Sequence, residues 1–119
     1  MVGIPDLENS FSAFEQDLAL LEDGDELRQQ LVRLAGEYLM ARIQWAFYDA
    51  SQRGSAGSNR TRAHDAFIAA LNAFTRKAAA GGSSLGWRRT FSVNGEVEER
   101  KRIGDFACYI AFRAALQAR

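Results

Sequence analysis

The stretch 27-LRQQLVRLAGEYLMARIQWAFY-48 decides the fold class of this chain. Its apolar stripe recurs at intervals of four and three residues, and it consists of Leu27, Leu31, Leu34, Tyr38, Ala41, Trp45 and Tyr48. Such intervals match the α-helical period of about 3.6 residues, so these side chains share one helix face. The stretch therefore predicts a long amphipathic helix.

The segment before it repeats the pattern. Its apolar stripe is Ile4, Leu7, Phe11, Phe14, Leu18 and Leu21. This spacing predicts a first helix from about Pro5, a residue suited to a first helical turn, to about Leu21. The acidic run 22-EDGD-25 then breaks the helix and offers Asp25 as the next N-cap. We expect these two helices to form an αα-hairpin with coiled-coil-like packing.

The segment 51-SQRGSAGSN-59 separates this hairpin from the carboxy-terminal half. It is rich in Gly and Ser and has no apolar side chain larger than alanine, which predicts a flexible internal loop. A third helix would then be capped by Ser58 or Asn59 and end at 81-GG-82. Its apolar side would carry Ala63, Phe67, Leu71, Phe74 and Ala78.

Residues 83–99 leave two structures open. Asn94-Gly95 is a typical two-residue hairpin turn, so 91–98 could form a β-hairpin. An isolated two-stranded ribbon is marginal in water, and no other segment resembles a strand. We favour a short helical turn over 85–90 and a last helix over 96–117.

Together these segments predict one all-α domain over residues 1–119. It would be a helical bundle of four main helices in two αα-hairpins, with a short extra helix or β-turn near 85–95. Apolar runs fall short of the roughly 18 residues of a membrane span, so we expect a soluble, cytoplasmic protein without membrane contact. Cys108 is the only cysteine, and no metal-ligand spacing or cofactor motif is present, so we expect neither metal nor cofactor.

The charges are distributed unevenly although the formal net charge is zero. Residues 1–27 contain eight acidic and no basic residues, whereas residues 28–119 contain seven acidic and all 15 basic residues. In one interpretation the acidic helix compensates the basic body, within the fold or across a dimer. In the other, the basic part binds a polyanion.

Two segments of the carboxy-terminal half carry polar stripes beside apolar faces, namely 62–76 and 102–109. The candidate ligand-binding residues on them are His64, Asp65, Asn72, Arg76, Arg102, Asp105 and Cys108. If the two helices pack together with Gly104 at the contact, Asp105 can meet Arg62 or Arg76, and Asp65 can meet Arg102 or Arg88. The pattern fits either a structural clasp or a pocket for a small anion.

Other functions draw on overlapping residues. The candidate nucleic-acid contacts are Arg60, Arg62, Arg88, Arg89, Arg100 and Lys101. Trp87 and Phe91 lie among them and could stack on bases. Cys108, His64 and a carboxylate could form a catalytic triad, but a cysteine in mid-helix lacks the helix N-terminus that stabilises a thiolate. We therefore do not favour an enzyme.

The segments 62-RAHDAFIAALNAFTR-76 and 102-RIGDFACYIA-111, with Trp87-Arg88 between them, resemble the carboxy-terminal part of a small bacterial protein family of unknown function. The resemblance covers about half of the chain. It implies an all-α domain of bacterial origin, and it brings no activity, cofactor or catalytic residue.

The leading expectation is a non-enzymatic helical interaction or regulatory protein that forms a homodimer through its first or second helix. Large apolar residues on both helices exceed what one hairpin can cover. One alternative is a nucleic-acid-binding accessory protein. The other is a small-anion pocket or enzyme around Asn72, Arg76, Asp105 and Cys108.

Overall fold

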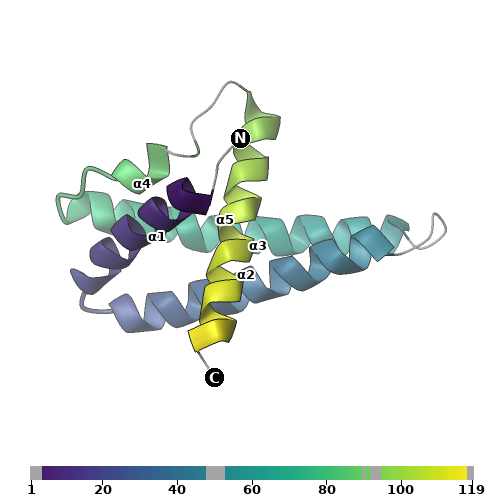
Figure 1. Cartoon of the computed structure of the whole chain (residues 1–119), viewed down its shortest axis with the longest axis horizontal. Coiled ribbons are helices and arrows are strands. Elements are labelled where there is room, and N and C mark those ends of the chain that lie inside the picture. Colours follow the sequence, from purple (N-terminus) through teal and green to yellow (C-terminus); the bar gives the residue numbers. More distant parts are fainter. Residues whose placement is uncertain (1–3, 48–52, 90, 92–94, 118–119) are drawn as a thin grey trace.

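The computed structural model describes residues 4–47, 53–89, 91 and 95–117, and these residues form five α-helices and no strand. The helices are α1 (Ile4–Ala19), α2 (Gly24–Phe47), α3 (Arg53–Ala80), α4 (Gly86–Arg89) and α5 (Glu96–Gln117). Helices α2 and α3 run antiparallel as a long pair, and α5 crosses them (Figure 1). The expected all-α class is confirmed. No helix in this part of the chain has the length and apolar character needed to cross a membrane.

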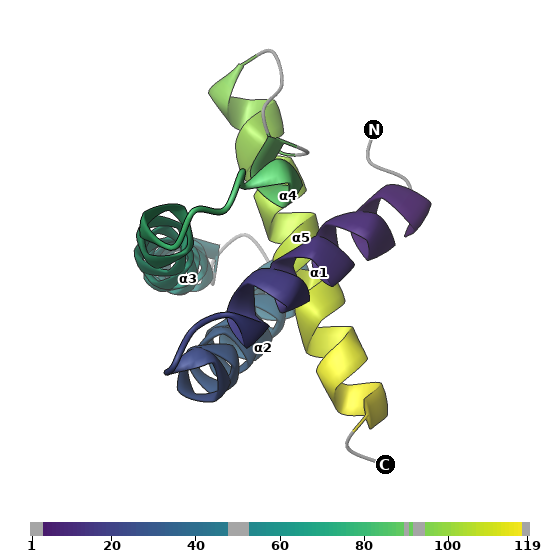
Figure 2. The ribbon, with the colours of Figure 1, turned by 90° about the vertical axis from the view of Figure 1, so that its left-hand side faces the viewer.

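The helices pair differently from the expected two hairpins. Helix α2 packs most extensively with α3 and α5, whereas α1 lies obliquely across the bundle and also contacts α4 and α5 (Figure 2). The apolar stripe of α2 was identified correctly, since Leu31, Leu34 and Tyr38 are buried. Tyr48 lies outside the described residues. Periodicity finds the buried face of a helix but not the helix that covers it, and here α3 and α5 cover it.

Local signals predicted several helix ends. Helix α3 stops where expected, because Gly82 adopts a φ of 93° and the Ser83 N–H donates to the Ala78 carbonyl at 3.0 Å. The short helix α4 lies within the predicted 85–90 turn, and α5 has the predicted bounds after Gly95, whose φ is 99°. The alternative β-hairpin over 91–98 is not formed in the described residues, because α5 begins at Glu96. Residues 92–94 of that segment lie outside the described residues.

Two predicted starts were wrong. Helix α3 begins at Arg53, so residues 53–59 are helical rather than a loop, and Ser58 and Asn59 do not cap it. Glycine weakens a helix by only about 1 kcal/mol per residue, which packing can offset. Helix α2 begins at Gly24, so Asp23 and not Asp25 precedes it, and the Leu27 N–H donates to the Asp23 carbonyl. A hydrogen bond from Lys77 lowers the pKa of the Asp23 carboxyl.

Aromatic rings form the centre of the core. The Phe14 ring meets Phe74, Trp87 and Phe106 edge-on at centroid distances of 5.0, 5.6 and 5.6 Å. Because these residues come from α1, α3, α4 and α5, one cluster joins four helices. Edge-to-face contacts at such distances are a favoured arrangement of aromatic side chains.

Asp17 ties α1 to the connection between α3 and α4. Its Oδ2 accepts hydrogen bonds from the Trp87 indole at 2.7 Å and from the Ser83 hydroxyl at 2.8 Å. The Ser83 Oγ in turn accepts from the Leu85 N–H at 3.0 Å. A carboxylate that accepts two side-chain donors orients both of them.

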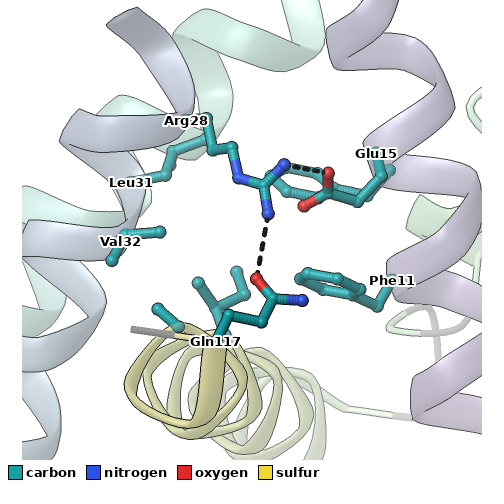
Figure 3. Close-up of a pocket in the computed structure, with 9 residues that line it drawn as sticks. Phe11, Glu15, Arg28, Leu31, Val32 and Gln117 are labelled. Carbon is teal, nitrogen blue, oxygen red and sulfur yellow. Dashed lines mark hydrogen bonds and ion pairs between the residues drawn. The ribbon is translucent and has the colours of Figure 1, made fainter. Parts of the chain in front are cut away.

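A small cavity lies between α1, α2 and α5 (Figure 3). Arg28 covers it, donating to Glu15 Oε2 at 2.6 Å and to Gln117 Oε1 at 3.3 Å. The cavity volume of about 10 Å³ corresponds to a single water at most. We therefore regard it as a packing feature and not as a ligand site.

Candidate functional site

A groove of about 500 Å³ opens where α2, α3 and α5 meet. Its lining residues are Tyr38 and Arg42 from α2, Arg60, Thr61, His64 and Asp65 from α3, and Arg100, Lys101 and Gly104 from α5. A second, more open hollow continues along α3 and adds Gly57, Ser58 and Arg62. The groove thus gathers side chains from three helices.

Gly104 sets the distance between α5 and α2. A Cβ at this position would lie 3.1 Å from Tyr38 Oη and 3.2 Å from Arg42 Nη1, closer than most Cβ contacts. The sequence predicted a close helix contact at Gly104, but it assigned the contact to the third helix and not to α2. This approach brings Arg100 and Lys101, one turn earlier on α5, to the groove.

Arg42 is held in place by several partners. Its Nη1 donates to Cys108 Sγ at 3.3 Å and lies 3.8 Å from Asp105 Oδ1. Its guanidinium also lies 5.7 Å from the centre of the Tyr38 ring. The expected ion pair of Asp105 with Arg62 or Arg76 is therefore wrong, because α5 crosses α2 here and presents Asp105 to Arg42.

Arg60 stacks on an aromatic ring at the other side of the groove. Its guanidinium carbon lies 4.2 Å from the centre of the Trp45 ring. Gly57, one turn before Arg60, lies beside the same ring, and a Cβ there would make an ordinary contact, 3.6 Å from Trp45 Nε1. The ring limits the conformations of Arg60 and leaves its charge in the groove.

His64 is largely buried in the groove wall. Its Nδ1 lies 3.1 Å from Asp65 Oδ1, and its ring packs edge-on to Tyr38 at 5.5 Å. The side chain is 19% exposed, and its buried Nε2 has no hydrogen-bond partner in the described part of the chain. Burial raises the pKa of the Tyr38 hydroxyl, against the opposing effect of Arg42, so Tyr38 lines the groove as a neutral phenol at pH 7.

The charge in the groove is positive. Arg42, Arg60, Arg100 and Lys101 line it, against one lining carboxylate, Asp65. Within the described ranges, neither Arg100 nor Lys101 has an ion-pair partner. Arg42 has one, since its Nη1 lies 3.8 Å from Asp105 Oδ1. Concave surfaces with one sign of charge concentrate ligands of the opposite sign.

Several predicted residues lie elsewhere. Asn72 accepts a hydrogen bond from Arg88 Nη2 at 2.9 Å, so these two join α3 to α4. Burial lowers the pKa of Arg88, and Glu99 opposes this effect.

The Arg102 guanidinium lies 3.6 Å from Glu98 Oε1 on its own helix. The predicted pairing of Asp65 with Arg102 or Arg88 is therefore not formed, and the two polar stripes do not close on each other. Arg76 and Arg89 are exposed and do not line the groove.

Trp87 and Phe91 cannot serve as stacking platforms for bases, as the sequence had suggested. They are 2% and 1% exposed, and both pack in the aromatic core. Their position between basic residues in the sequence reflects the short helix α4, which turns Trp87 inward while Arg89 faces solvent.

Cys108 shows no catalytic arrangement. Burial raises the pKa of its thiol, against smaller effects of Arg42 that lower it, and Cys108 does not line the groove that contains His64. A neutral thiol away from the candidate base cannot act as the nucleophile of a triad. Among the described residues, no group of three or more His, Cys, Asp or Glu could hold a metal ion.

Sequence reasoning missed Tyr38, Arg42 and Thr61 as groove residues. Tyr38 was assigned to the apolar stripe, and Arg42 follows it by one helical turn next to Ala41. The available signal was Arg42 itself, a basic residue beside the buried apolar stripe. It indicates a cation close to the core, although it does not identify the helix that would lie against it.

We expect Asp105→Asn to lower the free energy of unfolding by only about 0.5–1 kcal/mol, because the Arg42 and Asp105 side chains are 37% and 39% exposed and water screens the pair. In a double-mutant cycle measured by urea unfolding, Arg42→Gln and Asp105→Asn should couple, whereas Arg76→Gln and Asp105→Asn should be additive. Coupling with Arg76 instead would contradict the observed pairing.

Comparison with known proteins identifies no relative of this chain. No protein-family model matches the chain, no curated protein matches it, and no solved structure matches its fold. The resemblance of 62–76 and 102–111 to a bacterial family therefore stays a prediction. The groove is therefore the feature from which a function can be inferred.

Proposed function

We propose that this protein is a non-enzymatic, cytoplasmic binding protein whose groove holds a ligand with phosphate groups. The observation that supports this is the convergence of Arg42, Arg60, Arg100 and Lys101 from three helices on one groove, with Asp65 as the single lining carboxylate. This role is non-enzymatic, as expected from the sequence. Its residues include members of both the predicted small-anion site and the predicted nucleic-acid contacts.

Phosphate oxygens suit these side chains. An arginine guanidinium can donate two parallel hydrogen bonds to a phosphate, and charge-assisted bonds of this kind are about twice as strong as neutral ones. Arg42 and Arg60 are held by Tyr38 and Trp45, which lowers the entropy lost on binding. The groove volume of about 500 Å³ falls in the usual range for small-molecule sites.

The groove favours contacts to phosphate over contacts to bases. Tyr38 is only 7% exposed, and Arg60 occupies one side of the Trp45 ring. Tyr38 therefore offers no free face for stacking on a nucleobase, and Trp45 does not line the groove. A short polyphosphate and the backbone of a nucleic acid carry the same phosphate chemistry, so they must be distinguished by experiment.

We expect Arg100→Glu/Lys101→Glu to weaken binding of inorganic tripolyphosphate by at least about 30-fold, because two cations become anions at the groove. Isothermal titration calorimetry at low salt measures this. The matched control is Arg76→Glu/Arg89→Glu, which makes the same change of charge at exposed positions outside the groove and should change the affinity by less than about threefold.

A second titration uses a 12-residue oligothymidylate. Binding of the oligonucleotide but not of tripolyphosphate, lost in Arg100→Glu/Lys101→Glu, would identify nucleic acid as the source of the phosphates, and salt dependence would follow. If neither probe binds at 1 mM, or if the control variant loses as much affinity as the groove variant, the proposal is wrong.

A further inference from the structure

Helix α2 carries an exposed apolar stripe on the side opposite the groove. Gly36, Met40, Ile43 and Phe47 follow one another at intervals of four, three and four residues. Met40, Ile43 and Phe47 are 55%, 40% and 84% exposed, and a Cβ at Gly36 would have no neighbour within 4 Å. On a helix of 3.6 residues per turn this stripe points about 180° away from Tyr38 and Trp45.

We propose that a second copy of this chain covers the stripe, with the two α2 helices packed antiparallel about a two-fold axis. Such an axis midway between Met40 and Ile43 also lies midway between Gly36 and Phe47. Met40 then faces the second copy's Ile43, and Phe47 faces the open space at the second copy's Gly36. The stripe is therefore complementary to itself in size, as a two-fold interface requires.

The neighbouring positions fit the same register. On one flank, Glu37 comes opposite the second copy's Gln44, whose amide can donate to the carboxylate. Glu37 is 3.3 Å from Arg33 and its side chain is still 55% exposed, so it can accept a further hydrogen bond. On the other flank, Leu39 comes opposite Ala46. No like charges meet at these positions, which favours self-pairing of α2.

The exposed area sets the expected strength. Three large apolar side chains with these exposures present on the order of 350 Å² per copy, so the stripe and its flanks would bury roughly 1,000 Å² in total. This lies at the lower limit of specific interfaces, and we expect dissociation in the micromolar range. Among the described residues, the other exposed large apolar side chains are Leu20, directly after α1, and Phe112 and Leu116 on α5. The groove lies on the opposite side of α2 and stays open, so this inference does not depend on the proposed function.

Sedimentation equilibrium of the full chain from 5 to 500 µM tests the proposal. The wild type should pass from the 13.2 kDa monomer to a dimer over this range. Phe47→Glu should weaken dimerisation by at least about tenfold. The control Phe112→Glu changes another exposed ring, on α5, and should leave dimerisation unchanged. A wild type that stays monomeric at 500 µM, or equal effects of both variants, would overturn the proposal.

Cross-linking tests the antiparallel register. In a Cys108→Ala background, Gly36→Cys and Phe47→Cys proteins should each form little disulfide-linked dimer alone, because identical positions lie about 16 Å apart along the axis. Their mixture should form a cross-linked heterodimer under mild oxidation. Circular dichroism confirms that each variant is folded. Cross-linking of each single variant alone, with none gained on mixing, would indicate a parallel pairing and contradict the register.

Discussion

Trp87→Ala is expected to lower the free energy of unfolding by about 3–5 kcal/mol, the usual cost of truncating a large buried aromatic residue. Trp87 is 2% exposed and lies between two rings, 5.6 Å from Phe74 and 6.4 Å from Phe106, both nearly parallel to it. Domains of this size have total stabilities of about 5–15 kcal/mol, so the loss is a large fraction. Urea unfolding followed by circular dichroism at 222 nm measures it.

Two further variants separate the packing from the hydrogen bond. Trp87→Phe keeps most of the ring contacts but removes the donor to Asp17 Oδ2, so we expect a loss of about 1–2 kcal/mol. Arg89→Ala, in the same short helix but exposed, should lie within about 0.5 kcal/mol of wild type. If Trp87→Ala costs less than 1 kcal/mol, α4 does not pack on the core as described.

Helix ends and buried helix faces could be predicted from the sequence, because both depend on residues close together in the chain. The glycine pair at 81–82 ends a helix because Gly82 adopts a left-handed φ, and the buried faces follow from apolar spacing. The loop predicted over 51–59 is helical in its described residues, 53–59, because the low helix propensity of glycine is a weak preference. Just after this segment, Arg60 packs on the ring of Trp45 from α2, and local reasoning cannot include such a contact with another helix.

The sequence predicted several residues of the candidate site but not how they assemble. His64, Asp65, Arg60, Arg100 and Lys101 were all identified, yet they were divided between two different hypotheses. They meet because α5 packs against α2 rather than against α3, and Gly104 permits this close packing. A crossing partner is decided by packing over the whole domain, so residues far apart in sequence acquire a common role only in the fold.

The turn between α1 and α2 supplies a second large effect, because Gly24→Ala should lower the free energy of unfolding by about 3 kcal/mol, at the upper end of the range for overpacking. Gly24 is buried, and an added Cβ would overlap the carbonyl oxygen of Leu18 and lie 3.1 Å from its carbonyl carbon. Backbone atoms cannot rotate away as a side chain can. The Gly24 N–H also donates to the Leu21 carbonyl at 3.2 Å, so a shift of this residue would lengthen a turn hydrogen bond.

Gly36→Ala on the same helix is the matched control, with the opposite sign. Its Cβ would meet nothing within 4 Å, and alanine favours a helix interior over glycine by about 0.5–1 kcal/mol. The variant should therefore be more stable than wild type when both are measured near 1 µM, below the concentrations at which we expect dimers. Thermal and urea unfolding measure both variants. If Gly24→Ala also stabilises the protein, the α1–α2 turn is not the tight contact described, because the overlap with the Leu18 carbonyl should outweigh any gain in helix propensity.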